Sequence, residues 1–216
     1  MFQAALLLLA LFAVSFLLGS IPWGVIISKV FFKTDIRKHG SGNIGTTNAM
    51  RSLGKVGGGA VFVLDFAKGL FSGVVAMPFA HQVQNALVAE AVSAESFFGI
   101  IASAGVGGTE AIFNLCLAIS FLGCVWGHIF SPWLGFKGGK GIAVAVGCLF
   151  MVFGPVGALL ELSIFIVLVV ASRYVSLGSV AAAVACPFFS LYYFWGNWFS
   201  VVLCSISDIT VVWAHR

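Results

Sequence analysis

The chain has 216 residues, of which 61% are hydrophobic and 8% are charged, with a formal net charge of +4. Soluble proteins are only about 45–50% apolar, so this composition excludes an ordinary soluble domain, in which polar residues must cover the surface. We expect an all-α polytopic membrane protein in which residues 1–216 form a single integral membrane domain. The modest charge gives no reason to expect a nucleic-acid partner.

The apolar stretch at the start of the chain predicts a first spanning helix, since a span needs about 20 apolar residues. This helix, Phe2–Gly19, lacks the basic segment that precedes a signal peptide, so we expect it to be retained, with cleavage near Ala13–Ser15 as the alternative. Pro22 bends the chain, and apolar sequence continues to Phe32 before a polar loop that reaches about Lys55.

The remaining helices bring the expected number of spans to about seven. The segment 81–110 is rich in polar and small residues, so we expect it to be partly irregular. The expected helices are Gly57–Ala80, Ala111–Trp126, Gly141–Phe153, Val156–Ala171, 179–195 and Trp198–Trp213. The third of these is short, so it either crosses only partway or begins inside a cavity. The link Ser172–Gly178 precedes the sixth span.

The distribution of charge predicts the orientation. Lysine and arginine are concentrated in 29–55 and recur at Lys137, Lys140 and Arg173, whereas 81–110 holds three glutamates and no lysine or arginine. Cytoplasmic loops carry the excess of basic residues in membrane proteins. With seven spans, the N-terminus is therefore outside, and all the basic segments face the cytoplasm.

Two polar, glycine-rich loops interrupt this apolar sequence, at Arg37–Arg51 and Phe136–Gly141. The first combines closely spaced glycines with hydroxyl, amide and guanidinium donors, which suits a phosphate group. The second places two lysines before a helix N-terminus, which also attracts anions. The alternatives are a flexible linker for the first loop and a lysine anchor at the lipid headgroups for the second.

Several other polar residues have both a structural and a functional interpretation. Three interpretations are open for His128: it binds an anion, it shuttles a proton, or it only makes a hydrogen bond to the backbone. Asp65 and Lys68 are three residues apart and can pair within one helix. Arg173 can be a snorkelling residue beside a helix cap, and His215 part of a basic tail. The five cysteines lie in apolar segments as packing residues, and no histidine cluster has metal-ligand spacing, so no metal is expected.

The motifs resemble, in order, those of the acyl-phosphate:glycerol-3-phosphate acyltransferases, bacterial membrane enzymes of the PlsY type. The matching segments are Gly19–Gly24, Gly40–Asn48 with Arg51, Leu64–Gly69, Gly127–His128, Gly135–Ala143 and Arg173–Ser176. Thr46 and Val144 depart from the family pattern, which has Ala and Thr there.

The resemblance implies a seven-helix enzyme of the bacterial inner membrane, with two glycine-rich cytoplasmic loops around its active site. It would move an acyl group from acyl phosphate to the 1-hydroxyl of glycerol 3-phosphate, without a cofactor or metal. The products would be lysophosphatidic acid and phosphate. Membrane lipid surrounds such an enzyme, and an acyl-phosphate-forming enzyme would supply its donor. A transporter or channel for an organic phosphate is the alternative, although we find no internal repeat.

Carried over by position, the resemblance implies the site residues. The expected catalytic residues are His128, Lys140 and Arg51. The expected substrate-binding residues are Ser41, Gly42, Asn43, Gly45, Thr47, Asn48, Lys137, Gly138, Gly139, Ser176 and His215. Because acyl phosphate is already activated, no acyl-enzyme is needed, and the hydroxyl proton passes to His128 or to a phosphate oxygen of the donor.

Overall fold

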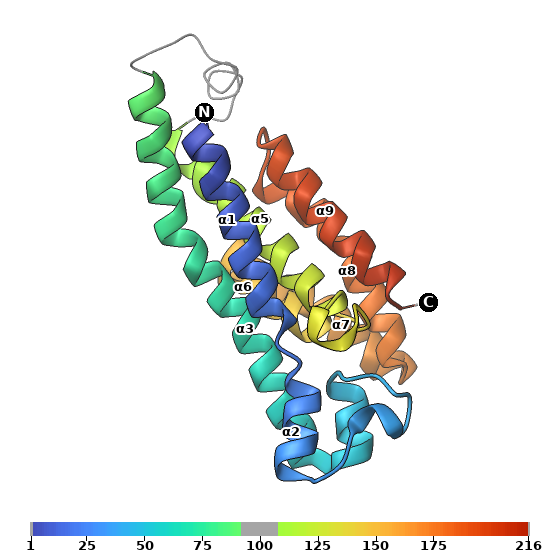
Figure 1. The fold of residues 1–216 in the computed structure, drawn as a ribbon. Helices are drawn as coiled ribbons and strands as arrows, with labels where there is room; N and C mark the ends of the chain where they lie inside the picture. Colours follow the sequence, from blue (N-terminus) through green and yellow to red (C-terminus); the bar gives the residue numbers. More distant parts are fainter. Residues whose placement is uncertain (1, 92–107, 216) are drawn as a thin grey trace.

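The computed structural model describes residues 2–91 and 108–215, and its regular structure within these ranges is entirely helical (Figure 1). Figure 1 shows α1, α3, α5 and α9 running along the length of the bundle. Buried apolar side chains of α1, α3, α5 and α6 form most of the main core, and α8 and α9 complete it. The expected all-helical fold is therefore confirmed for the described residues.

The N-terminal segment contains two helices, and the break between them lies at Pro22, where a bend is predicted. Helix α1 (Phe2–Ser20) ends two residues before Pro22, and α2 (Trp23–Phe31) starts directly after it. Proline lacks an N–H group, so the break is expected at this point. A short 3₁₀ helix, η1 (Ile36–Lys38), follows and begins the first glycine-rich loop.

Helix α3 (Thr46–Ala91) is longer at both ends than the predicted helix Gly57–Ala80, so both predicted boundaries are wrong. It starts at Thr46 rather than after Lys55, because Ala49 and Leu53 bury one helical face before Gly54 kinks the chain with φ of 75°. At its other end, the helix continues through 81–91, where Val83 and Ala86 are buried on one face. The remainder of the segment expected to be irregular, 92–107, lies outside the described residues.

Helix α5 (Gly108–Ile129) is the central helix and is longer at both ends than predicted. Gly127, at its C-terminal end, packs so closely on α1 that an added Cβ would lie 2.0 Å from the Phe16 carbonyl oxygen. This contact keeps the helix regular past Trp126, so His128 lies in its last turn and not in a loop. A 3₁₀ helix, η2 (Pro132–Leu134), precedes α6 (Ile142–Val152).

The last three helices are α7 (Gly154–Ser172), α8 (Val175–Tyr193) and α9 (Trp198–Trp213). The α9 bounds match the prediction. The predicted seven-residue link before α8 is reduced to Arg173 and Tyr174, because Arg173 ends α7 in the left-handed conformation with φ of 64°. Ser176 therefore lies in the first turn of α8.

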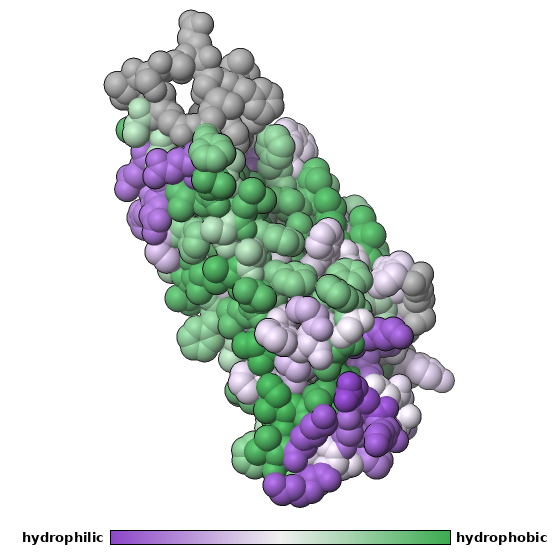
Figure 2. Space-filling model, viewed as in Figure 1, coloured by the Kyte–Doolittle hydropathy of each residue, from purple (hydrophilic) through white to green (hydrophobic). Residues whose placement is uncertain are grey.

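Among the residues that the structure describes, five helical stretches are long and apolar enough to cross a membrane: 2–31, 46–89, 108–134, 154–172 and 175–193. Helices α6 and α9 are apolar but shorter, so the count of seven spans stays a prediction. Figure 2 shows hydrophobic side chains over the middle of the bundle and hydrophilic ones toward its two ends, beside the upper part of α3 and around the loop that follows α2. This pattern is that of a multi-pass membrane protein.

All five cysteines are free and buried, as predicted.

Candidate active site

A cavity of about 980 Å³ brings the two glycine-rich loops together with the C-terminal helices. Eight of the residues between Ser41 and Arg51 line one side, and Lys140 with the first turn of α6 lines another. His128 and Asp65 border the cavity, and α7, α8 and α9 close it with both polar and apolar side chains. Segments that are far apart in the sequence thus line one cavity.

The first loop is organised by the side chain of Asn48, which is 2% exposed. Its Nδ2 donates to the carbonyl oxygens of Ile36, His39 and Asn43, at 3.3, 3.1 and 2.7 Å. Its Oδ1 accepts from the Ser41 N–H at 3.0 Å. One amide therefore joins the start, middle and end of the loop, and Asn48 acts on the cavity mainly by fixing this backbone.

Replacing Asn48 by Ala should lower kcat/KM at least tenfold and reduce thermal stability. The change leaves the buried Ile36 carbonyl oxygen and three part-buried backbone groups without their partner. A fully buried group left unpaired costs about 1–3 kcal/mol. Activity and melting temperature of the purified variant in detergent check this. As the matched control, Asn85→Ala removes an amide from the exposed face of α3 and should change neither quantity. Wild-type stability in Asn48→Ala would contradict the role given to this amide.

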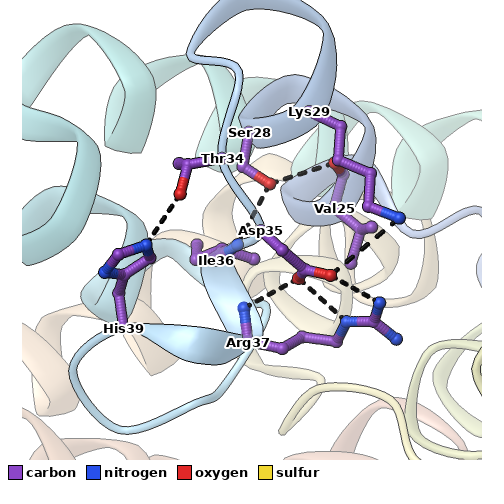
Figure 3. Close-up of polar contacts among 8 residues, drawn as sticks. All are labelled: Val25, Ser28, Lys29, Thr34, Asp35, Ile36, Arg37 and His39. Atoms are coloured by element: carbon purple, nitrogen blue, oxygen red, sulfur yellow. Dashed lines mark hydrogen bonds and ion pairs between the residues drawn. The ribbon is translucent and has the colours of Figure 1, made fainter.

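A charged cluster supports the same loop from α2 (Figure 3). The Asp35 carboxylate accepts from the Arg37 guanidinium at 2.6 and 2.9 Å, and Lys29 lies 3.9 Å away. The bond from Arg37 holds the pKa of Asp35 well below its usual range, against the opposing effect of burial, and the same bond raises the pKa of Arg37. Because the folded-state pKa of Asp35 is lowered, its contribution to stability is fully present above its unfolded pKa. It is lost only as pH falls through the folded value.

The second loop is joined to the end of α5 through its glycines. The N–H groups of Gly138 and Gly139 donate to the carbonyl oxygens of Ile129 and His128, at 2.9 and 3.1 Å. These N–H groups are therefore not free for a phosphate, contrary to the simplest form of the prediction. Their bonds hold the chain so that Lys140, half-buried, reaches the cavity, with Ile142 and Ala143 of the α6 N-terminus beside it.

A second, smaller cavity of about 260 Å³ adjoins the second loop. Lys137, Gly138 and Gly139 line this smaller cavity and not the large one. Asn43 and Lys140 line both, so they stand where the two cavities meet. Gly42 lines neither, since its N–H closes a turn with the His39 carbonyl oxygen at 3.0 Å. The remaining expected site residues all line the large cavity.

His128 is held by a buried network beneath the cavity. The Lys68 ammonium nitrogen lies 2.8 Å from His128 Nδ1, 3.0 Å from Asp65 Oδ1 and 2.9 Å from the Ile21 carbonyl oxygen. The predicted pairing of Asp65 with Lys68 is thus confirmed, and His128 is added to it. On the other edge of the ring, Nε2 faces Gly139, where a Cβ would lie only 2.2 Å away.

The far wall of the cavity carries Arg173, Ser176 and His215. The His215 Nδ1–H donates to the Val211 carbonyl oxygen at 2.8 Å, which leaves Nε2 as the acceptor of the neutral ring. Burial lowers the pKa of His215, and the positive charge of Lys140 lowers it further. The neutral form of His215 is therefore favoured near pH 7.

Comparison with known proteins agrees with this site. A sequence model described as glycerol-3-phosphate acyltransferase matches residues 9–216. The chain belongs to this family. The glycerol-3-phosphate acyltransferase of Listeria monocytogenes is 34% identical over 211 residues, covering 98% of this chain and 89% of the relative. That of Thermosynechococcus vestitus is 36% identical over 212 residues, covering 98% and 90%.

Solved structures extend this agreement to three dimensions. A crystal structure of PlsY, an integral membrane glycerol 3-phosphate acyltransferase in its glycerol 3-phosphate form, matches with a TM-score of 0.74 and 31% identity. It covers 97% of this chain, and 88% of that protein is matched. The lysophosphatidic acid form of PlsY matches with a TM-score of 0.71. The acyltransferase reading is thus supported and the transporter alternative is not.

In this acyltransferase, the cavity also contains residues that sequence reasoning did not select. Thr46, Glu161 and Asp208 line it, and each has a buried oxygen without a hydrogen-bond partner among the described residues. One feature of the sequence could have indicated Glu161 and Asp208: both lie within apolar helices, where carboxyl groups are functional candidates by default. Within the described ranges, no three His, Cys, Asp or Glu side chains are placed to hold a metal ion.

Proposed function

We propose that this member of the family transfers a fatty acyl group from acyl phosphate to the 1-hydroxyl of glycerol 3-phosphate, releasing lysophosphatidic acid and phosphate. One observation carries the proposal: cationic and hydroxyl groups from both loops, Arg173 at the end of α7 and two hydroxyl groups of α8 line one cavity whose inner wall is apolar. The related PlsY was solved in forms with glycerol 3-phosphate and with lysophosphatidic acid, which are a substrate and a product of this reaction.

Two anionic substrates must be brought together in this cavity, and its charges suit that task. Arg51 can bind a phosphate through two parallel hydrogen bonds, and Lys140 lies beside the N-terminus of α6, whose dipole also attracts an anion. Ser41, Thr47 and Ser176 supply hydroxyl donors around them. We propose that these groups hold both phosphates and stabilise the charge that develops on the acyl carbonyl oxygen.

The chemistry requires no acyl-enzyme, because acyl phosphate is a mixed anhydride. The 1-hydroxyl oxygen attacks the acyl carbon, and the bond from that carbon to the phosphate oxygen breaks. The hydroxyl proton passes to an oxygen of the departing phosphate, which leaves as inorganic phosphate. The protein supplies position and electrostatic stabilisation, which together account for large rate enhancements.

The contacts of His128 favour a hydrogen-bond donor over a general base. The Lys68 ammonium group can only donate, so Nδ1 of His128 accepts its bond. The neutral ring then carries its proton on Nε2, on the edge that faces Gly139 and the cavity. A ring in this tautomer has no free lone pair with which to accept the substrate proton. We therefore assign His128 to positioning and stabilisation of the reacting groups.

His128→Gln should keep kcat/KM within about tenfold of wild type, whereas His128→Ala should lose considerably more. A glutamine amide can place an N–H near the position of Nε2, so it replaces a donor but not a general base. Loss of a general base would cost about 10² to 10⁴ in rate. Steady-state kinetics of both variants check this. Equal, large losses in Gln and Ala, with both proteins folded, would contradict the donor role.

The remaining expectations form part of the same proposal. We propose that the protein lies in a bacterial inner membrane with its N-terminus outside and the active site open to the cytoplasm, where glycerol 3-phosphate is dissolved. Concentration of basic residues in the two loops supports this orientation. The apolar wall formed by α7 and α8 gives the acyl chain a path continuous with lipid. An enzyme that forms acyl phosphate must act before it.

The decisive experiment uses the whole chain purified in detergent with acyl phosphate and labelled glycerol 3-phosphate. We expect labelled lysophosphatidic acid and an equal amount of phosphate. Acyl-CoA in place of acyl phosphate should give no product. Product from acyl-CoA alone would overturn the proposed donor, and no product from either donor would overturn the proposed function.

A further inference from the structure

Two carboxylic acids lie in the apolar part of the cavity, away from the groups assigned to the phosphates. Glu161 of α7 and Asp208 of α9 are each 3% exposed, and both line the cavity. The neighbours of Glu161 on α7 include Leu162, Phe165 and Ile166, and these apolar side chains also line the cavity. An acidic residue in such surroundings is expensive to bury and is retained mainly where it has a function.

Each acid has one oxygen without a partner. Glu161 Oε2 and Asp208 Oδ2 are buried and make no hydrogen bond among the described residues. No lysine, arginine or histidine in the described ranges lies within 4 Å of either carboxyl group. Both carboxyl groups lie near the thiol of Cys186, a buried residue of α8. The two free oxygens therefore have no partner in the wall itself.

Their position in the helices places them along the path of the acyl chain. Asp208 lies in α9, and His215 follows two residues after the end of this helix, where its ring bonds to the Val211 carbonyl oxygen. All three residues line the cavity, and at 1.5 Å per residue the seven positions from Asp208 to His215 span about 10 Å. Glu161 is twelve residues before Arg173, in the part of α7 away from the loops. The acids therefore lie beside the middle of a chain whose carbonyl group is held near Lys140.

A saturated chain would cover these oxygens without replacing their hydrogen bonds to water, which is unfavourable. A hydroxyl group on the chain removes this cost, because it donates to a carboxylate and accepts from a carboxylic acid. Its fit is therefore independent of the charge state of the acids. A metal ion is a poorer occupant, since the described residues offer no group of three ligands there.

We propose that Glu161 and Asp208 form a polar subsite that binds a hydroxyl group at the middle of the acyl chain. Hydroxylated acyl phosphates are then preferred donors for this enzyme. The inference rests on the proposed function and deepens it, because it names the substrate class that the acyl part of the cavity selects.

The test compares stearoyl phosphate with stearoyl phosphate hydroxylated at mid-chain, in wild type and in Glu161→Leu/Asp208→Leu. Wild type should prefer the hydroxylated donor in kcat/KM, and the double variant should lower this preference about tenfold by improving use of the plain chain. Glu161→Gln/Asp208→Asn retains polar groups and should keep most of the preference. Val167→Leu, on the exposed face of α7, should leave it unchanged. A donor hydroxylated next to the carbonyl group should gain nothing.

A second readout does not depend on catalysis. Mid-chain hydroxystearate should raise the melting temperature of purified wild type more than stearate does, and the double leucine variant should lose this difference. Equal preference in wild type and the double variant, by both readouts, would overturn the subsite. This is the result expected if the two acids bind only water. Absence of acyl transfer from every acyl phosphate would instead overturn the proposed function, while the melting shifts still decide the subsite.

Discussion

Replacing Lys140 by Met should reduce kcat/KM by about 10²- to 10³-fold, the usual effect of removing one group that stabilises transition-state charge. Lys140 lines both cavities beside the N-terminus of α6, and its positive charge lowers the pKa of His215 across the site. It is thus placed to act on the carbonyl oxygen or a phosphate. The measurement is steady-state kinetics with acyl phosphate and glycerol 3-phosphate.

Three further variants separate charge at this position from charge elsewhere. Lys140→Arg keeps the cation and should recover part of the activity. Lys137→Met should have a smaller effect, because Lys137 is exposed and lines only the smaller cavity. Lys55→Met removes an exposed lysine just past the kink in α3 and should leave kcat/KM unchanged. A Lys140→Met protein with wild-type rates would exclude Lys140 from the reacting centre.

Gly138→Ala should abolish more than 99% of the activity and lower the melting temperature. The added Cβ would lie 1.9 Å from the His128 carbonyl oxygen and 2.9 Å from that of Ile129. Both are backbone atoms at the end of α5, so neither can rotate away. The loop must lift from α5, which breaks its bonds to Ile129 and His128 and moves Lys140 out of the cavity.

Gly59→Ala is the matched control, because nothing lies within 4 Å of its added Cβ and its φ is ordinary for a helix. Alanine is favoured over glycine in a helix by up to about 1 kcal/mol, so stability should stay the same or rise. Thermal unfolding and the acyl-transfer assay should be run on both variants. A Gly138→Ala protein with normal activity would show that the loop does not need this close approach.

Some features were predictable because they depend on local sequence. Pro22 marked the break between α1 and α2, and the run Trp198–Trp213 defined α9. Glycine, lysine and arginine within apolar sequence marked both loops, since polar groups in a bilayer are retained where they face protein or a water-filled cavity. The boundary errors at Thr46 and His128 have a different origin. Packing of Ala49 and Leu53, and of Gly127 on α1, continued these helices into segments whose composition indicated loops.

The roles of individual polar groups were not predictable, because each depends on which partner the fold brings near. Asn48 and Asn43 look alike in the sequence, yet Asn48 fixes the loop backbone while Asn43 stands where two cavities meet. The sequence predicts Gly138 and Gly139 as substrate-binding residues but does not show that their N–H groups donate to carbonyl oxygens of α5.

By itself, the sequence determined the class of this protein: an apolar, helical membrane chain with cationic glycine-rich loops, matching one acyltransferase family. Composition and motif order are properties of the chain, so they need no folded structure to be read. It is tertiary packing that brings Lys68 within hydrogen-bond distance of His128 and places Glu161 and Asp208 in the lining of one cavity. Hydrogen bonds and cavities act over a few ångströms, and that proximity exists only once α3, α5, α7 and α9 have packed together.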